Sequence, residues 1–270
     1  MIERDNVYLR LTREMNEGRL RAVISSGQAV VLHGLAIMSK DGDWILREDE
    51  EAMAHVLSVL ARHGARYRFG APLDVRWLRG GWSAHLEFSN GVLRVRTDFV
   101  TRPPRLEADD LGLLWRSQEG KAVPVVGIRQ LVELKKTDRE KDYVAIGELA
   151  RRLEDPAERL LCSRSARDIL ALAAEHPALS ERLSLRRPVL AEAKKGQDAL
   201  EVALDAERRA LVRANEARLF RYERAAEPFA ASWAEVAKST AGLPLPEAHQ
   251  IVVRRAEALL SFSPAPEGKP

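Results

Sequence analysis

The sequence contains a single cysteine, Cys162, among its 270 residues. One cysteine excludes an internal disulfide framework and is typical of a protein kept in a reducing compartment. No apolar run approaches the roughly 20 residues that a membrane-spanning helix needs. The first five residues carry acidic side chains where a signal peptide would have an apolar stretch. We therefore expect a cytoplasmic protein that does not enter a membrane.

Two common kinds of site are also missing from the sequence. The chain has no Walker-type phosphate loop. Five histidines show no metal-ligand spacing, so a zinc site is not expected; they are His55, His63, His85, His176 and His249. His33 follows a short apolar segment, and we expect it to have a packing or hydrogen-bonding role.

The overall composition is that of a folded globular protein. Hydrophobic residues make up 46% of the chain and charged residues 31%. Lysine and arginine number 43 against 40 acidic residues, giving a net charge of +3. The two signs are interspersed, so the charge balance permits contact with phosphates but is weak evidence for nucleic-acid binding.

The chain changes character near residue 155. Before it, strand-like and helix-like stretches alternate; after it, only helical patterns remain. Strands are expected over 20–24, 44–46, 73–78, 83–88 and 93–100, with helices over 28–33 and 49–65. Further helices are expected over 128–136, 138–153, 165–176, 198–226 and 247–262, with a helix start at Asp155-Pro156 and a stop at Pro228. The pattern predicts an α/β (α+β) domain with a mixed sheet over 1–155, an all-α region over 156–262, and a disordered tail over 263–270.

The segment Asp41-Gly42-Asp43 carries the strongest chemical signal. Side chains alternate along a strand, so two aspartates separated by one residue point to the same face. Carboxylate oxygens are ligands that Mg²⁺ prefers, and pairs of Mg²⁺ ions serve phosphoryl transfer. Asp98, on a later predicted strand, is placed to supply a third carboxylate.

Upstream, Ser26-Gly27 ends a predicted strand and opens a helix. Small residues let a backbone approach phosphates closely, and the amide groups that begin a helix attract anions. The turn therefore predicts a phosphate-binding site. Each of these features is common on its own, and it is their order and spacing that carry the prediction.

The order of these motifs resembles the minimal nucleotidyltransferase superfamily, whose fold is that of the DNA polymerase beta catalytic domain. The matching segments are 24–34, 39–44 and 97–99, and the stretch 126–142 is similar to the segment that follows the core in the bacterial abortive-infection-type branch. The resemblance covers about residues 20–153.

The resemblance implies a site and a reaction. Asp41, Asp43 and Asp98 would be the catalytic and metal-binding residues, holding two Mg²⁺ ions. Nucleotide-binding residues would be Ser26, Gly27, Lys135, Lys136 and Asp142, with the choice between the two lysines left open. The donor would be an NTP, and the acceptor an RNA end, such as that of tRNA, or a protein hydroxyl. Relatives of this branch include toxins of toxin–antitoxin systems, so an antitoxin protein is an implied partner.

Two departures from the family pattern leave an alternative open. Ser26 stands where the family has its first glycine, and Gly42 stands where an apolar residue separates the two acids. The alternative is a degenerate, non-catalytic member that acts as a nucleotide-binding or regulatory module. A third interpretation is an α/β nucleic-acid-binding domain with surface aspartates. Six arginines lie on the predicted helix over 198–226, but acidic residues share that helix and favour a solvated face.

Overall fold

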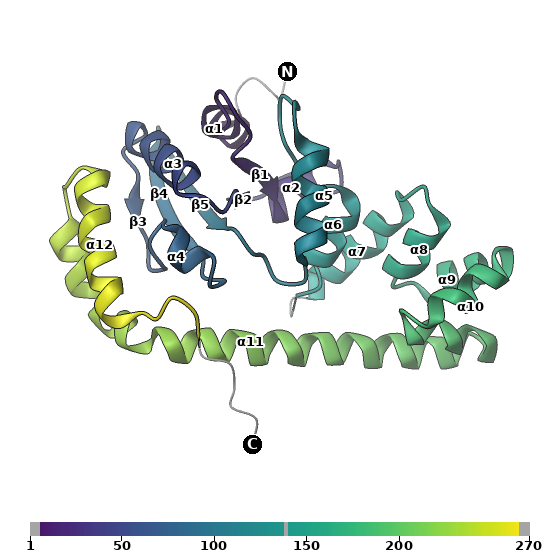
Figure 1. Cartoon of the computed structure of the whole chain (residues 1–270). Helices are drawn as coiled ribbons and strands as arrows, with labels where there is room; N and C mark the ends of the chain where they lie inside the picture. The colour runs from purple at the N-terminus through teal and green to yellow at the C-terminus, as the bar shows by residue number, and fades with distance from the viewer. Residues whose placement is uncertain (1–5, 138–139, 265–270) are drawn as a thin grey trace. The chain divides into compact units, whose positions relative to one another are not determined.

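A computed structural model of the chain describes residues 6–137 and 140–264, apart from the side chains of residues 140 and 141 (Figure 1). The chain forms two compact units, one made of Met1–Val126 and Leu219–Pro270 and the other of Gly127–Arg218. The boundary expected near residue 155 falls inside the second unit. Helix α11 (Gln197–Thr240) contributes residues to both. The residues 265–270, which include most of the expected tail, lie outside the described residues.

The first unit is built on a five-stranded sheet. Its strands are β1 (Ala22–Ser25), β2 (Asp41–Leu46), β3 (Arg66–Tyr67), β4 (Ala84–Asn90) and β5 (Leu93–Val100), in the order β1-β2-β5-β4-β3. The β2–β5 pair is parallel and the other three pairs are antiparallel. The sheet is therefore mixed, and the predicted fold class of an α/β domain followed by an all-α region is confirmed.

One face of this sheet is apolar and is covered by helices. The helices of the unit include α1 (Val7–Met15), α2 (Ser26–Leu32), α3 (Glu50–Arg62), α4 (Val75–Leu78), α5 (Ala108–Gln118) and α12 (Leu245–Leu259). Trp44 and Phe99 are register partners whose stacked rings have centroids 5.5 Å apart. The Trp44 indole donates a hydrogen bond to Thr12 Oγ1 at 2.9 Å, which ties α1 to this face. Helix α3 crosses the sheet (Figure 1).

Two sequence-based predictions in this unit are wrong. Residues 75–78 form helix α4 and not a strand, because Asp74 caps the turn by accepting a hydrogen bond from the Arg76 amide. Helix α11 does not stop at Pro228 but continues to Thr240. An internal proline costs a helix about 3 kcal/mol. Phe229 and Val236, buried in one cluster with Trp77, offset that cost through packing.

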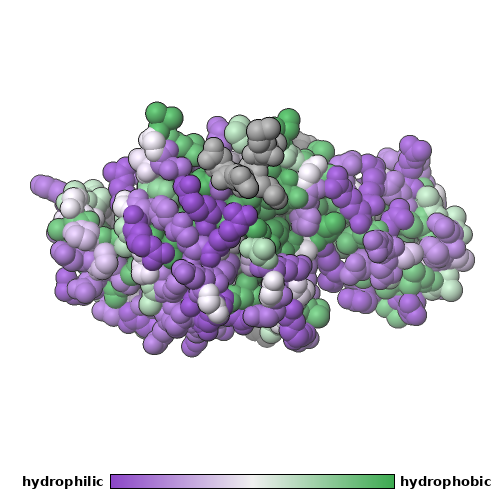
Figure 2. Space-filling view, turned by 90° about the horizontal axis from the view of Figure 1, so that it is seen from above, coloured by the Kyte–Doolittle hydropathy of each residue, from purple (hydrophilic) through white to green (hydrophobic). Residues whose placement is uncertain are grey.

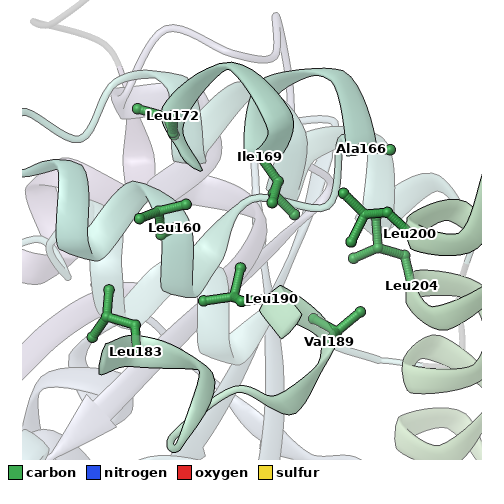
Figure 3. Packing of buried hydrophobic residues seen from close by; sticks show 9 residues of the cluster. All are labelled: Leu160, Ala166, Ile169, Leu172, Leu183, Val189, Leu190, Leu200 and Leu204. Atoms are coloured by element: carbon green, nitrogen blue, oxygen red, sulfur yellow. The ribbon is translucent and has the colours of Figure 1, made fainter. Parts of the chain in front are cut away.

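The second unit is entirely helical, as the pattern predicts. Before α11 it contains α6 (Ile128–Leu134), α7 (Glu140–Arg151), α8 (Pro156–Cys162), α9 (Ala166–Glu175), α10 (Pro177–Ser184) and the 3₁₀ helix η2 (Pro188–Lys195). Leucines and Ile169 fill its core (Figure 3). Buried Arg187 donates to the carbonyl oxygens of Leu160 and Ser163 and to the Glu207 carboxylate, so its guanidinium joins α8, η2 and α11.

Several large or reactive side chains are buried. Trp44, Trp77 and Trp82 are core residues, and Cys162 is buried. Burial raises the pKa of the Cys162 thiol to about 11. Within the described ranges, we find no helix with the length and apolar character needed to cross a membrane. Hydrophilic residues cover much of the face seen from above (Figure 2).

Candidate active site

The second face of the sheet carries the predicted carboxylates. In the parallel pair of β2 and β5, Asp43 lies opposite Asp98 and Asp41 lies opposite Arg96. Residues two apart on a strand share a face, and so do register partners on neighbouring strands, which lie about 4.8 Å apart. Asp41, Asp43 and Asp98 therefore leave the sheet on the same side. Asp43 and Asp98 are 55 residues apart in the chain, but their strands are adjacent in the sheet.

Asp98 is held by two neighbours that the sequence analysis did not identify. His85 Nδ1 lies 2.7 Å from Asp98 Oδ1, and Arg68 Nη1 donates to the same oxygen at 3.2 Å. His85 Nε2 in turn lies 2.9 Å from Ser83 Oγ. A Cβ atom on Gly70 would collide with the His85 ring, so the absence of a side chain there lets the backbone pack against the imidazole. The spacing Ser83-x-His85 in a predicted strand signals a shared face, but only the fold reveals that this face meets Asp98.

The side chains fit a divalent cation in their chemical type, but they do not form a ready-made cage. Within the part of the chain that the structure describes, no three metal-ligating side chains gather in one cluster, and Asp98 Oδ1 faces His85 and Arg68. Asp41 Oδ1 is buried and accepts no hydrogen bond from the described residues, with Arg96 Nη1 at 3.8 Å. A buried carboxylate oxygen without a donor is costly, and a cation would satisfy it. The donor set of three carboxylates suits Mg²⁺.

The pKa of Tyr8 responds to the charges of Asp41 and Asp43. Its hydroxyl donates a hydrogen bond to the Lys40 carbonyl oxygen at 2.7 Å. Burial raises the pKa of Tyr8, and the negative charges of Asp41 and Asp43 raise it further. The negative charges of Asp41 and Asp43 thus act on the Tyr8 hydroxyl, which lies against the start of β2.

The two departures from the family pattern have structural consequences. Ser26 adopts a φ of 49°, in the left-handed region that glycine tolerates best, which explains why a glycine is expected at this position. Gly42 lies on the apolar face, where a Cβ atom would collide with Trp44 and approach Tyr8 Cδ1 to 2.6 Å. Gly42 therefore makes room for two aromatic rings beneath the aspartates.

Gly27 is also needed for close packing. A Cβ atom at this position would collide with Ser39 Oγ. Ser39 belongs to the segment that leads into β2, and the side-chain nitrogen Nε2 of Gln28 donates a hydrogen bond to the Ser39 carbonyl oxygen at 3.0 Å. The space beside the Gly27 backbone is thus taken up by Ser39, a contact that the sequence analysis did not foresee.

The remaining predicted residues lie in the second unit. Lys135 and Asp142 are both buried, and Lys135 Nζ lies 3.1 Å from Asp142 Oδ1. Thr137 Oγ1 donates to the other carboxylate oxygen at 2.7 Å. Lys136 instead pairs with Glu133 at 2.6 Å. Of the two lysines, Lys135 is therefore the one whose charge is held in place by Asp142. Arg139, in the same predicted segment, lies outside the described residues.

A cleft of about 820 Å³ opens beside Asp41 within the first unit. It is lined by cationic, amide and apolar side chains, including Gln28, Ile37, Lys40, Arg94 and Arg96. The Asp41 side chain faces this cleft at the end of β2. Of the predicted site residues, Asp41 alone lines this cleft; its lining does not include Asp43, Asp98 or Gly27.

Comparison with known proteins adds little to this description. No protein-family model matches the chain, and neither does any curated protein. Two solved structures show a distant likeness. A "putative nucleotidyltransferase from H. pylori" is 13% identical with a TM-score of 0.37, over 75% of this chain and 93% of that one. JHP933 from Helicobacter pylori is 13% identical with a TM-score of 0.35, over 78% and 92%. Likenesses at this level carry no argument about activity.

Proposed function

We propose that the protein is a Mg²⁺-dependent nucleotidyltransferase that moves an NMP from an NTP to an acceptor hydroxyl on an RNA end or a protein. The observation that carries the proposal is the sheet register, which sets Asp98 opposite Asp43 and beside Asp41 on one charged face. Three carboxylates on one face repel one another unless a cation lies between them. Phosphoryl transfer with two metal ions requires such a set of carboxylates.

In this proposal, Asp41, Asp43 and Asp98 hold the metal ions. When bound, Mg²⁺ lowers the pKa of the acceptor hydroxyl and neutralises charge on the leaving pyrophosphate. The acceptor oxygen forms a bond to the α-phosphorus, the bond from that phosphorus to the bridging oxygen breaks, and pyrophosphate leaves. His85 and Arg68 fix the orientation of the Asp98 carboxylate through Oδ1. Hydrogen bonds to metal-ligating groups tune a site in this way.

The nucleotide is proposed to contact two further sets of residues. Lys135, Lys136 and Asp142 lie in the second unit, and their contact with a phosphate stays a prediction from the family resemblance. Lys135 pairs with Asp142 and Lys136 with Glu133, so ion pairing does not favour one lysine over the other. The backbone at Ser26 and Gly27 remains part of the proposed nucleotide site. A role as a toxin with an antitoxin partner stays a prediction from the family resemblance.

A second candidate function is that of a non-catalytic nucleotide-binding or regulatory module. The occupied Asp98 oxygen favours it, since His85 and Arg68 satisfy that carboxylate without a metal. In such a module, NTP binding would persist without transfer.

The test is a labelling experiment with the whole chain. The protein is incubated with Mg²⁺, each of four α-labelled NTPs, and total RNA, beside an Asp41→Ala/Asp43→Ala double variant. Transfer of label to RNA or to protein in the wild type alone supports the transferase. Metal-dependent NTP binding without transfer supports the module, and the absence of both refutes both proposals.

A further inference from the structure

We propose that the cleft beside Asp41 binds single-stranded nucleic acid and presents its terminal hydroxyl to the carboxylates. The proposal rests on the proposed transferase function and chooses between its two classes of acceptor. Lys40, Arg94 and Arg96 all line this cleft, and Asp41 is the acid that lines it with them. The cleft lining therefore carries a net positive charge, although the cleft lies beside the acidic face of the sheet.

The cations form a row that leads to the carboxylates. Arg94 and Arg96 are two residues apart on β5, so their side chains share a face and their Cα atoms are about 6–7 Å apart. Arg96 is the register partner of Asp41. Lys40 directly precedes Asp41 in the chain. A polyanion bound by this row would end at the acidic face.

Two of the cations in this row are fixed by neighbouring residues. Glu87, which is buried, accepts hydrogen bonds from Arg94 and Arg66. Burial raises the pKa of Glu87, but the hydrogen bonds from Arg94 and Arg66 outweigh it, and the net shift of that pKa is downward. Glu87 therefore remains charged and orients Arg94. Tyr8 fixes the backbone at Lys40 through its hydrogen bond to the carbonyl oxygen.

Exposed apolar side chains also line this cleft. Ile37 is 102% exposed, Met38 74% and Leu93 48%. A nucleic-acid strand combines phosphates, which a positively charged groove follows, with bases that expose flat π-faces. The exposed aliphatic side chains beside the row of cations can contact those faces. A mixed lining of three cations and three exposed apolar residues favours this ligand over an ordinary protein surface.

The experiment measures binding of a fluorescent single-stranded RNA oligonucleotide to the full chain at several salt concentrations. Each phosphate contact with a single strand contributes about 0.7 to the slope of log affinity against log salt. The double variant Lys40→Gln/Arg96→Gln should therefore lower the magnitude of this slope by about 1.4. Lys121→Gln, which removes an exposed lysine outside the cleft lining, should leave the slope unchanged. Arg94 is not substituted, because its loss would remove a hydrogen-bond donor from the buried Glu87 carboxylate.

Binding of Mg–NTP is measured on the same variants, to separate an acceptor strand from the triphosphate. The proposal requires strand affinity to fall at least tenfold more than Mg–NTP affinity. Equal losses of strand affinity and Mg–NTP affinity would show that the cations bind the triphosphate, and would overturn the proposal. An unchanged salt slope, or label transfer to protein and never to RNA, would also overturn it while leaving the transferase function standing. Failure of the transferase itself would appear separately, as the absence of any metal-dependent transfer.

Discussion

Asp43 on β2 and Asp98 on β5 are register partners in the parallel pair of strands at the centre of the sheet. Their partnership places two carboxylates side by side, and the alternation of β2 adds Asp41 to the same face. The opposite face carries Trp44 and Phe99, which are also partners in this strand pair. One pair of strands thus separates a buried aromatic layer from a charged surface.

Replacing Asp43 with Asn should strongly weaken divalent-metal binding at this face. Asn keeps the size of the side chain but removes its charge, and loss of a metal ligand should weaken Mn²⁺ affinity by at least about 100-fold. The measurement is a Mn²⁺ titration followed by electron paramagnetic resonance. Asp109→Asn, an exposed acid in the first turn of α5, is the matched control and should bind Mn²⁺ as the wild type does. Equal affinity in the Asp43 variant would contradict the site.

His85 should affect metal binding by orienting the Asp98 carboxylate. In His85→Gln, the amide cannot reproduce a donor at the position of Nδ1, and Mn²⁺ affinity should fall by about 10–100-fold, as it does when outer-shell partners are lost. In His85→Asn, the amide nitrogen falls near the Nδ1 position and should restore most of the affinity. Thermal unfolding of both variants is followed in parallel. A purely structural histidine would show the same Mn²⁺ affinity in both variants, with any loss confined to stability.

A methyl group at Gly42 should destabilise the first unit. Its Cβ atom would collide with Trp44 and Tyr8, and overpacking of a dense core costs about 1–3 kcal/mol. Gly147→Ala is the contrasting variant, because that glycine lies in α7 with nothing within 4 Å of the added atom. It should stabilise its helix by about 0.5–1 kcal/mol. Urea unfolding of the two variants should therefore give changes of opposite sign, and matching signs would refute the packing argument.

Lowering the pH should decrease the stability of the first unit, because His249 resists protonation in the folded state. The ring makes a hydrogen bond with the Tyr67 hydroxyl, whose oxygen lies 2.7 Å from Nδ1. Burial lowers the pKa of His249, and the opposing effect of Asp74 does not cancel it. Above the unfolded pKa of about 6.5 the ring is neutral in both states. As the pH falls from there through the lower folded pKa, the unfolded chain takes up a proton that the folded chain resists, so the free energy of unfolding decreases.

The variant His249→Asn keeps a hydrogen-bonding group beside Tyr67 but cannot take up that proton. Its urea midpoint should fall less than that of the wild type between pH 7.5 and about pH 5, where the histidine titrates. Carboxylates away from the ring contribute equally to both proteins, so the difference reports the titration of His249 together with its coupling to Asp74. Equal losses in the two proteins would show that His249 does not control this pH dependence.

The parts of the fold that local chemistry specifies were predictable. Strand β5 occupies the predicted range, Asp155 and Ser165 cap the predicted helices, and the tryptophans of the strand region are buried. Errors came where packing overrides a local signal. Pro228 normally ends a helix, but the burial of Phe229 carries α11 past it. Asp74 caps a short helix inside a stretch whose apolar residues resemble a strand.

The sequence by itself determined the types of residue at the candidate site, since Asp41 and Asp43 alternate onto one face of any strand that contains them. Tertiary structure decided which residues meet them. The register of β2 against β5 brings Asp98 opposite Asp43, and the pairing of β4 with β5 brings His85 to Asp98, 13 residues away in the chain. Strand order and register depend on the burial of whole faces, a free-energy balance summed over many distant residues, and no short motif encodes that balance.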